Sequence, residues 1–139
     1  MAFKRVGSRT TSQNPIEYAL LTDNTNCELG QVMKFTSGRL ADGDVDSDGT
    51  VQVIALKTQA AEVTSVTPVP FEYINVDTEY ETTSSATVAV TLVGSKVELN
   101  ADMKRVTATT TKGIFEISRT DGATTNSKVR GYFRINTPI

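Results

Sequence analysis

The residues whose types and spacing come closest to a chemical site lie in one acidic segment, Asp44-Val45-Asp46-Ser47-Asp48-Gly49. Asp44, Asp46 and Asp48 occupy the first, third and fifth positions of a calcium-binding loop, and a glycine follows at the sixth. The twelfth position, where such a loop carries a bidentate glutamate, is Ala55. The segment is therefore a candidate calcium site, with an acidic hairpin loop as the alternative, and we expect no other cofactor.

Most catalytic machinery is excluded by the residue types that the chain lacks. It has no histidine, no tryptophan and one cysteine, which removes His-based triads, His metal sites and Cys-rich zinc sites. Without a histidine to activate it, Cys27 is interpreted as a small buried hydrophobe. Glycosidase chemistry needs only two carboxylates, but the chain has few aromatic residues to form a sugar-binding cleft, and we expect no enzyme. The glutamates on or beside expected strands are Glu72, Glu79, Glu81, Glu98 and Glu116.

The elements that position these residues are expected to be β-strands. The chain is rich in Thr and Val, which are β-branched and favour strands. Its 139 residues are enough for one hydrophobic core. The pattern predicts an all-β fold, a small β-sandwich or a barrel-like (tulip-like) domain. The expected strands are 31–36, 51–56, 71–76, 87–93, 96–99, 113–117 and 129–135, with hairpin turns at Ser37-Gly38 and Gly94-Ser95.

The N-terminal segment differs in composition from the rest of the chain. Lys4, Arg5 and Arg9 are cationic, and most of the other side chains are small or polar. Such a segment has too little apolar surface to become ordered on its own. The sequence therefore predicts a flexible or extended arm over 1–15, followed by a single β domain over 16–139. The alternative is an inert terminus.

Two classes of partner are disfavoured by charge and hydropathy. The net charge of −2 gives no general attraction to nucleic acid. Lys128, Arg130 and Arg134 lie on one late strand, and period two places Tyr132 on their face and Phe133 on the opposite one. One basic strand face is ordinary on an outer surface, so we expect no direct nucleic-acid contact. No apolar run approaches the roughly 20 residues that cross a bilayer, so we expect no membrane contact.

Several segments together resemble the small head decoration, or cement, proteins of tailed bacteriophages. The resemblance is carried by the hairpin at 29–40, the turn at 93–99, and the closing run through 113–117, 120–122 and 128–133. It covers roughly residues 16 to 136 and consists of turn chemistry and strand patterning.

This resemblance implies a non-enzymatic β module on the outer surface of the virion capsid, made in the host cytoplasm. Such proteins bind the major capsid protein after the shell expands, commonly as homotrimers at three-fold and quasi-three-fold positions, and brace it against packaged DNA. The trimer would form through strand faces, with Val88, Val90 and Leu92 or their neighbours as the contacts. The capsid-contact residues expected in the arm are Phe3, Lys4, Arg5, Val6 and Arg9.

Two further expectations follow from this interpretation. Deleting residues 2–14 should leave a folded trimer that no longer coats capsids. The alternative function is a carbohydrate- or receptor-binding β module of a phage or bacterial surface structure, which calcium in the acidic segment would favour.

Overall fold

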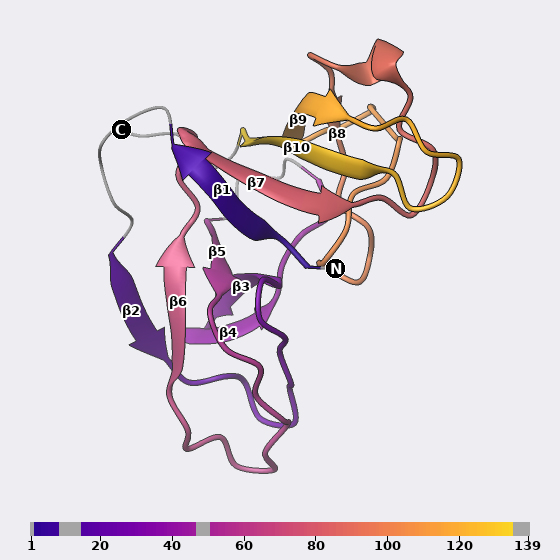
Figure 1. Cartoon of the computed structure of the whole chain (residues 1–139). Coiled ribbons are helices and arrows are strands. Elements are labelled where there is room, and N and C mark those ends of the chain that lie inside the picture. The colour runs from indigo at the N-terminus through magenta and orange to yellow at the C-terminus, as the bar shows by residue number, and fades with distance from the viewer. Residues whose placement is uncertain (1, 9–14, 47–50, 135–139) are drawn as a thin grey trace.

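The computed structural model describes residues 2–8, 15–46 and 51–134, which form two antiparallel five-stranded sheets (Figure 1). Sheet 1 has the strand order β1-β7-β10-β9-β8, and sheet 2 has the order β2-β6-β5-β3-β4. The all-β prediction is confirmed, in its sandwich form. The strands are β1 (Lys4–Ser8), β2 (Ile16–Ala19), β3 (Val32–Thr36), β4 (Arg39–Asp42), β5 (Gln52–Ala55), β6 (Val69–Tyr73), β7 (Thr78–Thr83), β8 (Lys96–Val97), β9 (Phe115–Thr120) and β10 (Lys128–Phe133).

Helical structure within the described residues is limited to one short 3-10 turn, η1 (Val90–Leu92). Accordingly, none of the described residues forms a helix with the length and apolar character to span a membrane.

The main hydrophobic core lies between the two sheets. Its centre is a group of aromatic rings in edge-on and tilted contact, with Phe133 lying 5.0 Å from Phe3, 5.1 Å from Phe115 and 5.4 Å from Tyr80 between ring centroids. Sheet 2 contributes Val32 and Ile54 to the same core. Such aromatic contacts add to the stabilisation that burial of the rings already provides.

A second hydrophobic core covers the other face of sheet 2. Met33, Val53 and Phe71 point away from sheet 1 and pack against Leu21 and Cys27, which lie outside the strands. Because sheet 2 is covered on both sides, β5 is buried at all four positions. This explains why residues 53–56 are continuously apolar. A strand covered on one face only would alternate apolar and polar residues.

The hairpin predicted around Gly38 is confirmed as the β3–β4 connection. Thr36 pairs with Arg39, so the loop holds two residues, Ser37 with a φ of 51° and Gly38 with a φ of 80°. Positive φ at both central positions is the geometry of a type I′ turn, whose twist matches that of the strands.

The N-terminal segment differs from the arm that composition suggested. Residues 4–8 form β1, which pairs antiparallel with β7 at the edge of sheet 1. Phe3 is only 4% exposed and belongs to the main core, and its N–H donates to the Gly30 carbonyl at 3.1 Å. A Cβ atom at Gly30 would overlap the Phe3 carbonyl oxygen, so the glycine permits this close approach. Residues 9–14 lie outside the described part of the chain.

Two of the expectations about this segment are corrected by that arrangement. Phe3 contributes to the chain's own core instead of being free to anchor a partner. Deleting residues 2–14 would remove Phe3 and an entire strand, so the deletion would disrupt the core instead of leaving an intact body.

The strand expected over 87–93 is also wrong, as is its hairpin with 96–99. Thr87 and Val88 make hydrogen bonds to the β9–β10 connection: the Val88 N–H donates to Ser127 Oγ at 3.0 Å, and the Thr87 hydroxyl donates to the Thr124 carbonyl. The chain then turns through η1, and β8 pairs with β9. Side-chain partners thus satisfy backbone groups that would otherwise form a strand ladder. Val88 is fully buried, and Val90 is exposed.

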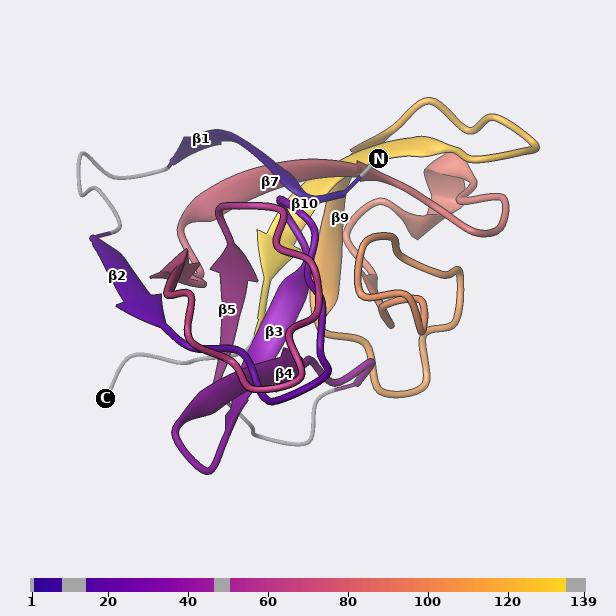
Figure 2. The same cartoon turned by 90° about the horizontal axis from the view of Figure 1, so that it is seen from below.

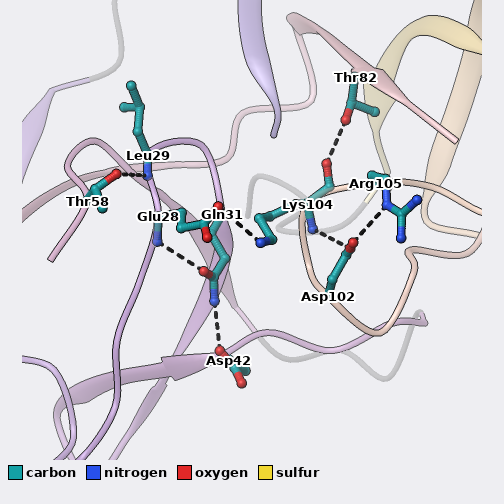
Figure 3. Close-up of polar contacts among 9 residues, drawn as sticks. All are labelled: Glu28, Leu29, Gln31, Asp42, Thr58, Thr82, Asp102, Lys104 and Arg105. Carbon is teal, nitrogen blue, oxygen red and sulfur yellow. Dashed lines mark hydrogen bonds and ion pairs between the residues drawn. The ribbon is translucent and has the colours of Figure 1, made fainter. Parts of the chain in front are cut away.

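A polar seam joins the two sheets through the loop between β8 and β9 (Figure 3). The Thr82 hydroxyl of β7 donates to the Lys104 carbonyl at 2.6 Å, and the Lys104 ammonium pairs with Glu28 at 3.0 Å. On the sheet 2 side, the Gln31 amide donates to Asp42 at 2.7 Å, and the Thr58 hydroxyl accepts the Leu29 N–H. The loop therefore connects β7 of sheet 1 to the segment that leads into β3.

Asp102 organises the turn of this loop, and its loss should destabilise the protein in a pH-dependent way. Burial acts to raise the pKa of Asp102, but hydrogen bonds from the Lys104 N–H, Arg105 and Asn100 outweigh burial and lower it. Replacing Asp102 with alanine removes these bonds and should cost about 1–3 kcal/mol of unfolding free energy at neutral pH. Urea denaturation at several pH values measures the effect.

The direction of the pH dependence follows from the lowered pKa of Asp102. The carboxylate stabilises the folded state fully above its unfolded pKa of about 4, and this contribution is lost as the pH falls through the lower folded pKa. The difference in unfolding free energy between wild type and Asp102→Ala should therefore become smaller as the pH falls. Glu17→Gln, at an exposed acid of β2, is the control and should leave stability unchanged. A gap that widens in acid would contradict this account.

Candidate interaction surface

The acidic segment shows an ion pair at its first candidate ligand. Asp44 accepts a hydrogen bond from the Lys34 ammonium at 2.6 Å, so a protein cation already neutralises this carboxylate. Asp46 lies in the described residues, and Asp48 lies outside them. No group of three or more ligand-type side chains that could hold a metal occurs among the residues described.

Two of the basic residues considered for nucleic acid, Arg130 and Arg134, form ion pairs with carboxylates. On the outer face of sheet 1, Arg130 pairs with Glu81 at 3.4 Å, and Arg134 pairs with Glu116 at 2.9 Å while stacking over Tyr132. Lys104 and Arg105 lie in the polar seam, paired with Glu28 and Asp102. Glu79, another of the strand glutamates, accepts a hydrogen bond from the Ser118 hydroxyl. Arg130 and Arg134 are thus neutralised by neighbouring carboxylates, whereas none of the ion pairs in the described residues involves Lys128.

Cys27 lies in the second core, as its interpretation as a small hydrophobe requires. Burial raises the pKa of its thiol, and this effect outweighs the opposing effects of the Gln59 N–H and the Lys57 charge. The thiol group donates a hydrogen bond to the Lys57 carbonyl. A buried thiol with a raised pKa is a poor nucleophile.

An open edge of the sandwich is formed by β1 and β2, which lie on the same side of the molecule in both views (Figure 1, Figure 2). Each is the terminal strand of its sheet. Ile16 is 60% exposed and Tyr18 is 67% exposed, although register places both on the face of sheet 2 that carries Glu72 and Ile54 and packs against sheet 1. The apolar face of sheet 2 thus extends beyond the cover of sheet 1.

The cationic residues of the N-terminal segment lie at the same edge. Lys4 and Arg5 are exposed on β1, and Val6 is half-buried. Arg9 lies outside the described residues. We call Lys4, Arg5, Ile16 and Tyr18 the β1–β2 edge surface. It combines apolar side chains, positive charge and two strands that are terminal in the sheets of the described residues, which are the features that bind an extended partner segment by strand addition.

A cavity of about 410 Å³ opens between the sheets next to this surface. Sheet 1 lines it with Arg5 and Tyr80, and sheet 2 lines it with Ile54 and Glu72. The Tyr80 hydroxyl donates to Glu72 Oε1 at 2.8 Å across the interface between the sheets. Both side chains are buried.

Comparisons with protein-family models, with curated proteins and with solved structures each found no match.

The sequence patterns predicted some residues of the β1–β2 edge surface and of the adjoining cavity, and they did not predict the others. The cationic residues were selected for their charge. Ile16 and Tyr18 were missed, although the alternation Ile16-Glu17-Tyr18-Ala19 after Pro15 is a strand signal. Tyr80 was missed because the alternating run 78–83 was not recognised as a strand. Glu72 was noted as a strand glutamate, but only the register shows that it faces the interior.

Proposed function

We propose that this protein is a bacteriophage head decoration protein, which binds the outer surface of the expanded capsid and stabilises it without catalysing a reaction. The observation that carries the proposal is the β1–β2 edge surface, where Ile16 and Tyr18 extend the apolar face of sheet 2 into solvent. An edge strand with large exposed apolar side chains is a site for association with another chain. The resemblance of the sequence to capsid cement proteins indicates which chain that is.

The charge of the β1–β2 edge surface also supports it as the capsid contact. Lys4 and Arg5 lie at this edge, and none of the ion pairs in the described residues involves them. Complementary charge speeds encounter with an acidic shell and fixes orientation more than it adds affinity. The apolar pair on β2 supplies the buried contact, and the major capsid protein is the proposed partner.

Binding as a homotrimer at three-fold and quasi-three-fold positions is part of the proposal. Three copies of a weak contact act together, so avidity can exceed single-site affinity by roughly 10²–10⁴. With Val88 buried, the exposed apolar residues of the η1 region are Val90 and Val93, and these replace Val88 as the proposed trimer contact. Scattering measurements should show trimers in solution or on particles. Monomers in both would contradict the trimer.

The capsid contact is tested by a double substitution on β2. Ile16→Ser with Tyr18→Ser removes the apolar side chains from an exposed strand and should weaken binding to expanded heads about tenfold or more. Co-sedimentation with undecorated heads measures the affinity. Val63→Ser with Val66→Ser is the matched control, because these two valines are at least as exposed as Ile16 and Tyr18 but lie on the loop between β5 and β6. If the β2 variant is folded and binds like wild type, this surface is not the contact.

A further inference from the structure

The cavity between the sheets contains a buried acidic group, Glu72, which forms no ion pair with any Lys or Arg of the described residues. Glu72 is 6% exposed and lines the cavity. Its one hydrogen-bond donor among the described residues is the Tyr80 hydroxyl, at 2.8 Å on Oε1. A buried carboxylate with a single neutral partner is costly, and a cation placed beside it lowers that cost.

The rest of the cavity is suited to an aliphatic chain. Its walls include Phe3, Leu29, Ile54 and Leu56, and its volume of about 410 Å³ lies within the range typical of small-molecule sites. Apolar walls with one convergent polar pair select a ligand that has an apolar body and one charged end.

Two cations also line the cavity, and they do not remove its preference for a positively charged ligand end. Lys4 and Arg5 line the cavity but are exposed, so water and salt screen their charges. Glu72 is buried, where electrostatic interactions are screened much less. Arg5 lies opposite Tyr80 in the register of sheet 1, and its charge opposes the binding of a cation.

We propose that this cavity binds a linear primary ammonium group, with the ammonium at Glu72 and its aliphatic chain against Phe3, Ile54 and Leu56. The same chemistry is carried by a free alkylamine and by a lysine side chain of another protein. The proposal does not rest on the capsid function, because the cavity and its buried acid are present in the single chain.

The test is a titration of the isotope-labelled full chain, followed by amide NMR shifts. Butylammonium should cause saturable shifts at Phe3, Leu29, Ile54 and Glu72, and butanol and butyrate should bind about tenfold more weakly or worse, since hydrogen bonds to charged groups are the stronger ones. A blocked peptide with one central lysine is the second arm. Tighter binding of the peptide than of butylammonium assigns the site to a lysine side chain, and the reverse assigns it to a free amine.

Two variants make the result specific to Glu72. Glu72→Gln keeps an acceptor for the Tyr80 hydroxyl and should bind butylammonium about tenfold more weakly, no better than butanol. Glu17→Gln, an exposed acid on β2, should bind like wild type. Arg5→Gln should bind more tightly than wild type, because a repelling charge is removed. The absence of saturable shifts, or equal binding by a folded Glu72→Gln variant, would overturn the proposal, whatever the outcome of the capsid experiment.

Discussion

Replacing Phe3 with alanine is expected to lower the free energy of unfolding by about 3–5 kcal/mol, the usual cost of removing a buried phenylalanine. The ring is 4% exposed and touches Phe115 and Phe133, with centroid distances of 5.5 and 5.0 Å. Its removal leaves a cavity between the sheets, which the sheet backbones cannot close. Small domains have only about 5–15 kcal/mol of stability, so the urea midpoint should fall sharply.

Val6→Ala is the control for this prediction, because Val6 lies on the same strand and is only half-buried. It should cost much less than Phe3→Ala. Phe3→Leu keeps most of the volume and should recover part of the stability. An unchanged midpoint for Phe3→Ala would mean that the N-terminal segment is an arm separate from the core, as its composition suggested.

Replacing Gly131 with alanine is expected to have the second largest effect, a loss of about 3 kcal/mol from overpacking. Gly131 lies in β10 at the register irregularity opposite Ile117 of β9. A Cβ atom there would overlap the Glu116 carbonyl oxygen and approach the Phe115 ring to 2.7 Å. Neither neighbour can move easily, because one is backbone and the other belongs to the aromatic core. Thermal or urea unfolding measures the loss.

Gly7→Ala is the matched control, since a Cβ atom at this strand glycine meets nothing within 4 Å. This variant should match the wild type or exceed it slightly, because alanine loses less conformational freedom than glycine on folding. If Gly131→Ala were as stable as Gly7→Ala, the close approach of β9 and β10 at this position would be wrong.

Local patterns were sufficient to predict much of the fold. Alternation identified residues 32–36 and 115–117 as strands, and Ser37-Gly38 identified the hairpin turn, because turn type depends on two residues. The strand expected over 87–93 failed because its hydrogen-bond partners, Ser127 and Thr124, are distant in sequence. Its β-branched residues favour a strand locally, and the tertiary contacts of this segment override that preference.

The N-terminal segment and the candidate site were harder to predict for the same reason. Composition alone makes residues 2–8 look unable to order, yet one aromatic residue, Phe3, anchors them to a core built from strands far along the chain. Likewise, Glu72 alternates with apolar residues as a surface residue would, and only its pairing with Ile54 and Ile16 shows which face it occupies. Register is a property of the assembled sheet, and the sequence of one strand does not specify it.

The function proposed for this chain is tested most directly by co-sedimentation of the wild-type protein with undecorated capsids from its source. Expanded and unexpanded heads are compared at the same shell concentration. The account predicts saturable binding to expanded heads alone, at a copy number per shell that is a multiple of three. Absence of binding to both forms would contradict the decoration function, even if every stability prediction above held.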